Sequence, residues 1–177
     1  MSFNTETQPG VCQHPDAVTQ QYVFNHTMLR VKDPERSLDF YTRVLGMRLL
    51  RRLDFEEGRF SLYFLAMTAG ERVPDEVAER QRYTFGRQSV LELTHNWGTE
   101  KDDSQYHNGN ADPRGFGHIC FAVPDIIAAC ERFESLGVPF VKRLDKGMKN
   151  VAFISDPDGY WIEIVQPGLN GEMGRSA

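Results

Sequence analysis

Two histidines and two glutamates stand at matching places in two similar stretches of the sequence. His26 and His118 each open an apolar run, and Glu92 and Glu163 each interrupt a later one. Alternate strand residues share a face, so a histidine and a glutamate from neighbouring strands can enter one concavity. An ionised glutamate among Val, Leu and Ile is costly unless it is paired or binds a cation. Imidazole nitrogen with carboxylate oxygen favours Zn, Ni, Co, Mn or Fe over Ca, so these four residues predict a metal site.

A single histidine–glutamate pair of this kind would be weak evidence. A strand histidine is more often a core or surface residue, and a strand glutamate usually faces solvent. The presence of the same pair in both stretches is what favours the metal interpretation. His14, His95 and His107 have no counterpart in the repeat. We interpret the first as an exposed arm residue and the other two as structural or peripheral residues of a linker.

The elements that would position these residues form one unit used twice: a strand, a helix and three further strands. In each unit an Asp precedes the helix as an N-cap and a Leu-Gly pair ends it. In the second unit, an Asp-Pro-Asp-Gly sequence at 156–159 marks a tight turn between the last two strands. The predicted strands are 23–31, 47–53, 60–66, 88–94, 118–123, 140–143, 151–155 and 160–165, and the predicted helices are 33–45 and 125–136.

This pattern predicts an α+β fold of two tandem βαβββ modules whose mixed sheets form a concavity. Helices that cover one side of the strands require a second unit or a partner chain to cover the rest. We expect one domain at 21–166 with modules at 21–95 and 115–166 and a linker at 96–114. Residues 67–87 are interpreted as an insertion that is partly helical around 76–82. Residues 1–20 are expected to form a flexible arm, and 167–177 a tail.

The composition excludes several classes of protein. The chain has 177 residues, 40% of them hydrophobic, and a net charge of −5, which argues against a nucleic-acid binder. No apolar run approaches the length of a membrane helix and no secretory signal is evident, so a cytoplasmic protein is expected. Cys12, Cys120 and Cys130 have unrelated spacings and predict neither a disulfide framework nor a zinc ribbon. Cys120 and Cys130 lie in apolar runs and are predicted to be reduced core residues.

Longer runs of the sequence resemble a known family. They include HTMLRVKDP at 26–34, SLDFYTRVLGM at 37–47, LELTHNWGTE at 91–100, YHNGN at 106–110, DPRGFGHI at 112–119 and DPDGYWIEI at 156–164. Together they closely resemble glyoxalase I (lactoylglutathione lyase), a family of the vicinal-oxygen-chelate superfamily. The resemblance covers nearly all of 22–166, and the insertion resembles the long, eukaryote-like form, which is typically zinc-dependent. It implies the paired βαβββ fold.

The resemblance assigns the family's four metal ligands to His26, Glu92, His118 and Glu163. Animal enzymes of the long form carry Gln where this chain has His26, whereas the short, nickel-preferring bacterial enzymes carry His. Zinc is therefore our first expectation and nickel the second.

The activity that the resemblance implies is isomerisation of the hemithioacetal of methylglyoxal and glutathione to S-D-lactoylglutathione. The family's base corresponds to Glu163, which moves a proton from C1 to C2, with Glu92 as ligand and counterpart on the opposite face. The family also builds each site between two subunits, which implies a homodimer. Substrate contacts are implied for Arg30, Asn96, Arg114, His118, Lys142 and Met148; Trp161 could line the pocket or belong to the core.

Three other activities share this superfamily. Extradiol dioxygenases hold iron with two His and one carboxylate, so the four candidate ligands, with Arg30 and Asn96, argue against that class. Epimerases acting on acyl-CoA are a further enzymatic alternative. Drug-sequestering proteins such as the bleomycin-binding proteins generally lack the four ligands, which are all present here.

Overall fold

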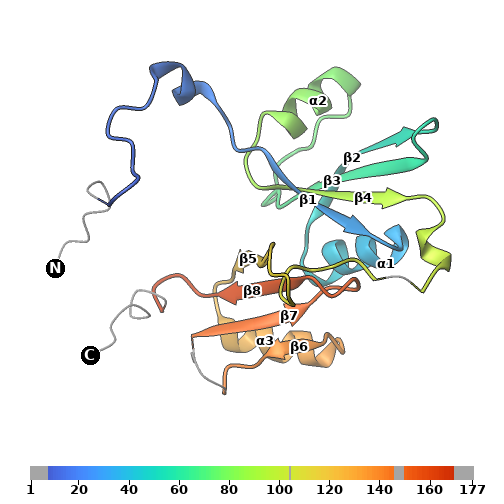
Figure 1. The fold of residues 1–177 in the computed structure, drawn as a ribbon, viewed down its shortest axis with the longest axis vertical. Coiled ribbons are helices and arrows are strands. Elements are labelled where there is room, and N and C mark those ends of the chain that lie inside the picture. Colours follow the sequence, from blue (N-terminus) through green and yellow to red (C-terminus); the bar gives the residue numbers. More distant parts are fainter. Residues whose placement is uncertain (1–7, 104, 146–149, 170–177) are drawn as a thin grey trace.

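The structure of the protein is a computed structural model. Strands β1, β2, β3 and β4 form the first of its two four-stranded sheets (Figure 1). The structure describes residues 8–103, 105–145 and 150–169. The strand order is β1-β4-β3-β2, with β1 parallel to β4 and the other pairs antiparallel. The strands are β1 (His26–Val31), β2 (Arg48–Phe55), β3 (Phe60–Ala66) and β4 (Val90–Asn96).

The second sheet repeats this topology in the order β5-β8-β7-β6, again with its first and last strands parallel. Its strands are β5 (His118–Ala122), β6 (Phe140–Lys142), β7 (Val151–Ser155) and β8 (Trp161–Val165). In each unit a helix follows the first strand of the sheet, so the predicted α+β fold with two repeated units is confirmed.

The helices begin where the sequence places their caps. Helix α1 (Pro34–Asp39) continues as η2 (Phe40–Val44), a π-helical stretch, and α3 is Ile126–Ser135. The side chains of Asp33 and Asp125 each accept hydrogen bonds from two backbone N–H groups of the first turn. Gly46 and Gly137 follow the two helices with φ of 76° and 69°, which is the left-handed conformation that glycine adopts without a steric penalty.

The predicted insertion carries helix α2 (Val77–Phe85), somewhat longer than the helical segment expected there. Glu76 caps it by accepting hydrogen bonds from the backbone N–H groups of Ala78 and Glu79. The insertion packs against the first sheet through a small separate core, whose buried members are Leu50, Phe64, Ala66, Val73 and Val90. Helix α2 therefore covers part of one face of that sheet (Figure 1).

Most element boundaries differ from the predicted ones by one to three residues, and two of these differences concern residues near the histidine–glutamate pairs. Strand β1 starts at His26 rather than at residue 23, and the Asn25 side chain just before it is hydrogen-bonded to the carbonyl groups of Thr84 and Arg87. His95 belongs to β4 rather than to the linker; it is buried, and its Nε2 lies 2.9 Å from Glu100 Oε2.

The N-terminal arm contains a short 3₁₀ helix, η1 (Ala17–Gln21), and extends away from both sheets (Figure 1). A second 3₁₀ helix, η3 (Thr99–Lys101), follows β4. Within the described ranges no helix is long and apolar enough to cross a membrane.

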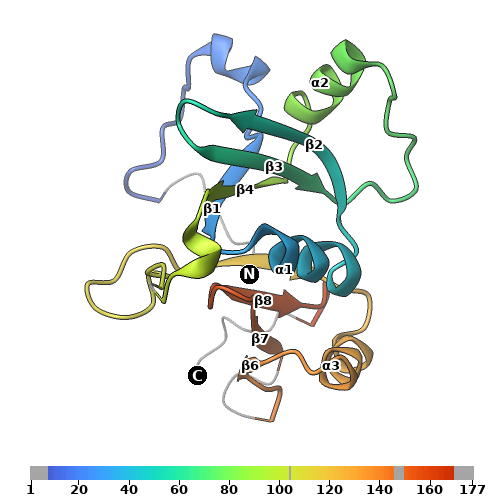
Figure 2. The ribbon, with the colours of Figure 1, turned by 90° about the vertical axis from the view of Figure 1, so that its right-hand side faces the viewer.

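One hydrophobic core joins the two units. Figure 2 shows α1 between the two sheets, and residues of η2, α3 and both sheets belong to a single buried cluster, against which Leu38 of α1 packs. Strand residues that point into it alternate with residues on the opposite, open faces. Members of the cluster from the two sheets include Leu29, Val31, Leu91, Leu93, Ala152, Ile154, Ile162 and Ile164.

A buried polar network also holds the units together. The turn between β7 and β8 lies against α1 and η2, and Tyr41 Oη donates a 2.8 Å hydrogen bond to Asp156 Oδ2. Asp158 Oδ1 accepts from the Lys32 backbone N–H at 3.1 Å, and Asp158 Oδ2 accepts from Ser37 Oγ at 3.3 Å. These hydrogen bonds link residues more than 100 positions apart, so they fix how one unit sits on the other.

Burial dominates the ionisation of this network. It raises the pKa of the Asp156 carboxyl to about 6, although the hydrogen bonds from Tyr41 and from backbone N–H groups act in the opposite direction. Burial likewise raises the pKa of Asp158, and burial together with the nearby Asp156 charge raises that of Tyr41 well above its ordinary value. The tyrosine therefore keeps its proton at neutral pH and donates it to Asp156.

Candidate functional site

The open face of the first sheet holds His26 and Glu92 in contact. Strands β1 and β4 run parallel with Met28 opposite Glu92, so His26, two residues earlier, faces the same side. His26 Nε2 lies 3.0 Å from Glu92 Oε2. The other carboxylate oxygen accepts a 3.1 Å hydrogen bond from Thr94 Oγ1. Both oxygens of this glutamate are therefore engaged by the protein.

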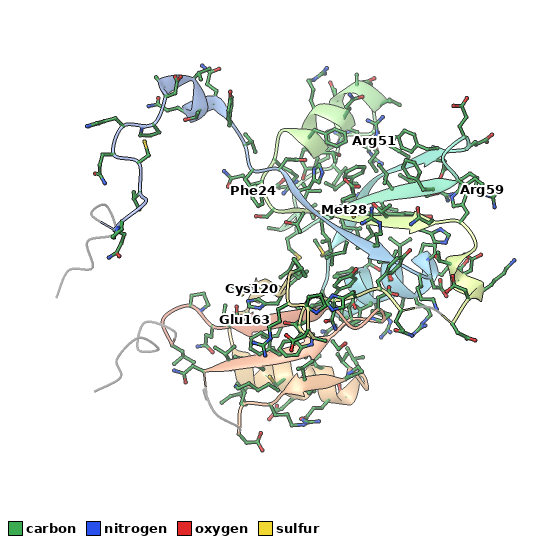
Figure 3. The ribbon with its side chains drawn as sticks, viewed as in Figure 1. Phe24, Met28, Arg51, Arg59, Cys120 and Glu163 are labelled. Carbon is green, nitrogen blue, oxygen red and sulfur yellow. The ribbon has the colours of Figure 1, made fainter. Side chains whose placement is uncertain are left out.

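The second sheet repeats the arrangement with His118 and Glu163. His118 Nε2 lies 3.3 Å from Glu163 Oε2, and Cys120 is opposite Glu163 on the neighbouring parallel strand. Figure 3 shows Cys120 and Glu163 side by side. A phenylalanine lies opposite each glutamate on the adjacent antiparallel strand: Phe64 opposite Glu92 and Phe153 opposite Glu163. Each histidine ring packs edge-on against that phenylalanine, at centroid distances of 5.8 and 5.3 Å.

The prediction that Cys120 is a core residue is wrong. Strand alternation places it on the exposed face together with His118, whereas Cys130 is buried as expected. Partial desolvation and the hydrogen bond to Glu163 raise the pKa of the Cys120 thiol to about 11. The thiol therefore keeps its proton at neutral pH and acts as a donor to the Glu163 carboxylate.

The donor atoms of the two pairs fit a divalent cation of the first transition row. Each pair offers one imidazole nitrogen and one carboxylate oxygen that already point at the same place, since they lie 3.0 and 3.3 Å apart. Imidazole and carboxylate together suit Zn, Ni, Co, Mn and Fe. Two such ligands do not complete the coordination of any of these ions, so neither pair is a complete metal site by itself.

The two half-sites do not meet within one chain. In the part of the chain that the structure describes, no three His, Cys, Asp or Glu side chains come close enough to hold a metal ion together. The pairs occupy equivalent open faces of two separate sheets. A four-ligand centre therefore needs a second copy of one of these faces.

The predicted substrate contacts of the first sheet lie beside its half-site. Arg30 is opposite Thr94, on the face that carries His26 and Glu92, and is exposed. Asn96 follows two residues after Thr94 on the same face, and its Nδ2 donates a 3.3 Å hydrogen bond to Tyr106 Oη. The sheet thus presents a guanidinium and an amide next to the histidine–glutamate pair.

The remaining predicted contacts are divided between the second sheet and the linker. Trp161 is opposite His118, and Lys142 is opposite Phe153, which is itself opposite Glu163. Lys142 Nζ donates to the Val151 carbonyl. Arg114 is exposed in the linker, with its Nε 3.6 Å from Asp112 Oδ1. Met148 lies outside the described residues.

Sequence reasoning missed the hydrogen-bond donors that accompany the two glutamates. Thr94 stands two residues after Glu92, and Cys120 two residues after His118. Strand periodicity was the signal for both, because residues two apart share a face. Their absence from the prediction came from treating the runs around them as uniformly buried.

Comparison with known proteins relates the whole of this arrangement to one superfamily. Residues 23–164 match the family model described as the Glyoxalase/Bleomycin resistance protein/Dioxygenase superfamily. The chain is 86% identical over 175 residues to lactoylglutathione lyase from Pseudomonas aeruginosa, covering 99% of each chain. It is 59% identical over 170 residues to lactoylglutathione lyase from Pseudomonas putida, covering 94% of this chain and 98% of the relative.

More distant relatives include eukaryotic proteins and a solved structure. Glyoxalase I from Saccharomyces cerevisiae is 52% identical over 153 residues, which span 85% of this chain and 46% of the yeast protein. The structure of the trypanothione-dependent glyoxalase I from Leishmania major matches with a TM-score of 0.63 at 32% identity, covering 86% of this chain and 91% of the other.

Proposed function

This chain belongs to the glyoxalase/bleomycin resistance protein/dioxygenase superfamily, and we propose that it functions as a lactoylglutathione lyase. It isomerises the hemithioacetal of methylglyoxal and glutathione to S-D-lactoylglutathione and so detoxifies methylglyoxal. The observation that carries this conclusion is 86% identity to a lactoylglutathione lyase over 99% of both chains. The geometry supports it, because both histidine–glutamate pairs are formed on equivalent faces of the two sheets.

The catalytic centre is composed from two copies of the chain. His26 and Glu92 of one subunit combine with the second half-site, His118 and Glu163, of its partner in a homodimer with two-fold symmetry. The support is that each half-site has two donors and that the described residues of one chain gather no larger group. A two-fold axis makes two equivalent sites from such an exchange.

The ligand set of two imidazoles and two carboxylates would hold Zn²⁺ first and Ni²⁺ second. When bound, the cation acts as a Lewis acid and stabilises negative charge that develops on the substrate oxygens. The protein's own part is to orient the hemithioacetal and to move its proton.

Glu163 is the group that takes the proton from C1 and returns it to C2. Its environment supports this role, because the donor beside it is a thiol, which is a weak hydrogen-bond donor. Glu92 is held more tightly, by His26 at 3.0 Å and by the stronger hydroxyl donor Thr94, whereas the His118 contact of Glu163 is 3.3 Å long. Glu92 is thus held as a ligand, while Glu163 retains a more available lone pair.

The glutathione part of the substrate binds to cationic and amide groups around the two half-sites. Arg side chains suit its carboxylates because they bind them bidentately. Arg30 is well placed for this role on the open face beside Glu92. The contacting residues are Arg30 and Asn96 from one subunit and Arg114, Lys142 and Met148 from the other, with Trp161 lining the pocket beside His118.

The test is a spectrophotometric assay at 240 nm, where the thioester product absorbs. The protein is mixed with methylglyoxal and glutathione before and after dialysis against a chelator, and Zn²⁺ or Ni²⁺ is then added back. We expect turnover that chelation abolishes and that metal restores, with more activity from Zn²⁺. Turnover that survives complete removal of metal, or no turnover with either ion, would refute the proposal.

A further inference from the structure

Asn25, the residue before His26, connects helix α2 to the first half-site. Its Nδ2 donates hydrogen bonds to the Thr84 carbonyl at 3.0 Å and to the Arg87 carbonyl at 2.7 Å. The Thr84 carbonyl belongs to the last turn of α2, where carbonyl groups have no intrahelical partners, and Arg87 lies two residues beyond the end of the helix. Asn25 therefore caps the helix of the insertion.

The same side chain determines which nitrogen of His26 carries hydrogen. Both amide hydrogens of Asn25 are committed to α2, so its Oδ1 can only accept a hydrogen bond. His26 Nδ1 lies 2.7 Å from this oxygen and must donate to it. The neutral ring then presents its lone pair at Nε2, which is the atom 3.0 Å from Glu92 Oε2. The Nε2 lone pair and the carboxylate then face each other at a distance that only a shared proton or a bound metal cation makes favourable.

A second contact from α2 reaches the same ring. Phe85, the last residue of α2, packs edge-on against Phe64 at a centroid distance of 5.0 Å, and Phe64 packs edge-on against His26. Contacts with the insertion therefore determine both the orientation and the tautomer of the His26 ring.

The second half-site lacks the amide contact. Trp161 packs against Phe153 at 5.8 Å, in the way that Phe85 packs against Phe64, so the aromatic support is repeated. The residue before His118, however, is Gly117, which has no side chain. The Asn25 contact is therefore specific to His26 and to the unit that contains the insertion.

We propose that Asn25 is a positioning residue that couples α2 to cation binding by holding His26 in the tautomer whose Nε2 lone pair faces Glu92. Groups that orient a ligating histidine typically change metal affinity by about 10- to 100-fold when removed. The inference rests on the proposed function only in that a cation binds at this nitrogen. It does not depend on which reaction the bound cation serves.

The experiment measures the Zn²⁺ affinity of the metal-free homodimer by competition with a chromophoric chelator. Asn25→Ala should weaken binding by about tenfold or more. Glu76→Ala is the matched control, because it removes the cap at the other end of α2 and leaves the His26 contacts in place. It should lower the melting temperature but change Zn²⁺ affinity by less than about twofold.

A double-mutant comparison assigns the effect to the histidine. In a His26→Gln background there is no ring tautomer to select, so Asn25→Ala should change Zn²⁺ affinity by less than about twofold. Equal losses in both backgrounds, equal effects of Asn25→Ala and Glu76→Ala, or an unchanged affinity of Asn25→Ala would each overturn the inference. Binding of Zn²⁺ or Ni²⁺ without turnover in the wild type would refute the proposed function alone, whereas absence of binding of both ions would refute both.

Discussion

Replacing Tyr41 with phenylalanine should destabilise the protein more at alkaline than at acid pH. Tyr41 is fully buried, and its hydroxyl donates a 2.8 Å hydrogen bond to Asp156, which is itself 4% exposed. The substitution removes a donor from a buried carboxylate. Hydrogen bonds to charged groups contribute about 1.5–3 kcal/mol to stability, and those between neutral groups about 0.5–1.5 kcal/mol.

The pH dependence follows from the pKa of Asp156, which burial raises from 3.8 to about 6. The folded protein therefore binds a proton on this group more tightly than the unfolded chain does. The contribution of the group to stability is most favourable below pH 4 and falls as the pH rises through 6. At pH 8 the carboxylate is ionised and needs the tyrosine donor most, so the loss in Tyr41→Phe should be about 2–3 kcal/mol there and about 1 kcal/mol at pH 5.

Thermal unfolding followed by circular dichroism at pH 5 and pH 8, at one protein and metal concentration, tests this expectation. A loss of 2–3 kcal/mol at pH 8 corresponds to a melting temperature lower by about 4–12 °C for a chain of this size. Tyr63→Phe is the control: Tyr63 is buried in the first sheet beneath the Arg52 guanidinium, 5.5 Å from its ring centre. Its effect should not change between the two pH values. An equal loss for Tyr41→Phe at both pH values, or a larger loss at pH 5, would refute the reasoning.

Three further predictions concern the junction and the site. Asp156→Asn should remove a pH-dependent contribution of about 3 kcal/mol from the free energy of unfolding, because the pKa of Asp156 is raised from 3.8 to about 6 and each pKa unit corresponds to about 1.4 kcal/mol. If calorimetry between pH 4 and 7 gave the same dependence of stability on pH as in the wild type, this prediction would be contradicted. Glu163→Gln should lower kcat by about 10²–10⁴ while bound metal measured by atomic absorption largely remains, and near wild-type turnover would disprove its role as base. Arg30→Ala should raise KM about tenfold with kcat little changed, because it contributes to binding in the ground and transition states alike; a fall confined to kcat would argue against a substrate contact.

The repeat was enough to find the two histidine–glutamate pairs, because residue type and strand period together place a pair on one face. His26 and Glu92 are 3.0 Å apart, as the alignment of the units implied. The two-residue period of a strand also places Cys120 on the same open face as His118, but its apolar neighbours led to the prediction that it is a core residue. Hydrophobic runs report the average burial of a strand and not the side on which a given residue lies.

The contacts between the two units could not be predicted from the sequence. The Tyr41–Asp156 hydrogen bond joins residues 115 positions apart and depends on how two sheets are placed on one helix. Likewise, the repeat alone could not show that the two pairs stay apart within one chain. Local patterns determine each unit, whereas the relation between units depends on packing that involves every element at once.

Mixing two inactive variants tests the shared catalytic centre most directly. Glu92→Ala and Glu163→Ala each remove one ligand from both sites of their own homodimer. After subunit exchange, a heterodimer has one site with both substitutions and one with neither, if each site takes Glu92 from one chain and Glu163 from the other. Random exchange makes about half of the dimers heterodimers, so the mixture should recover about one quarter of wild-type activity at 240 nm. No recovery, with exchange verified by mass-tagged subunits, would contradict a site built from two chains.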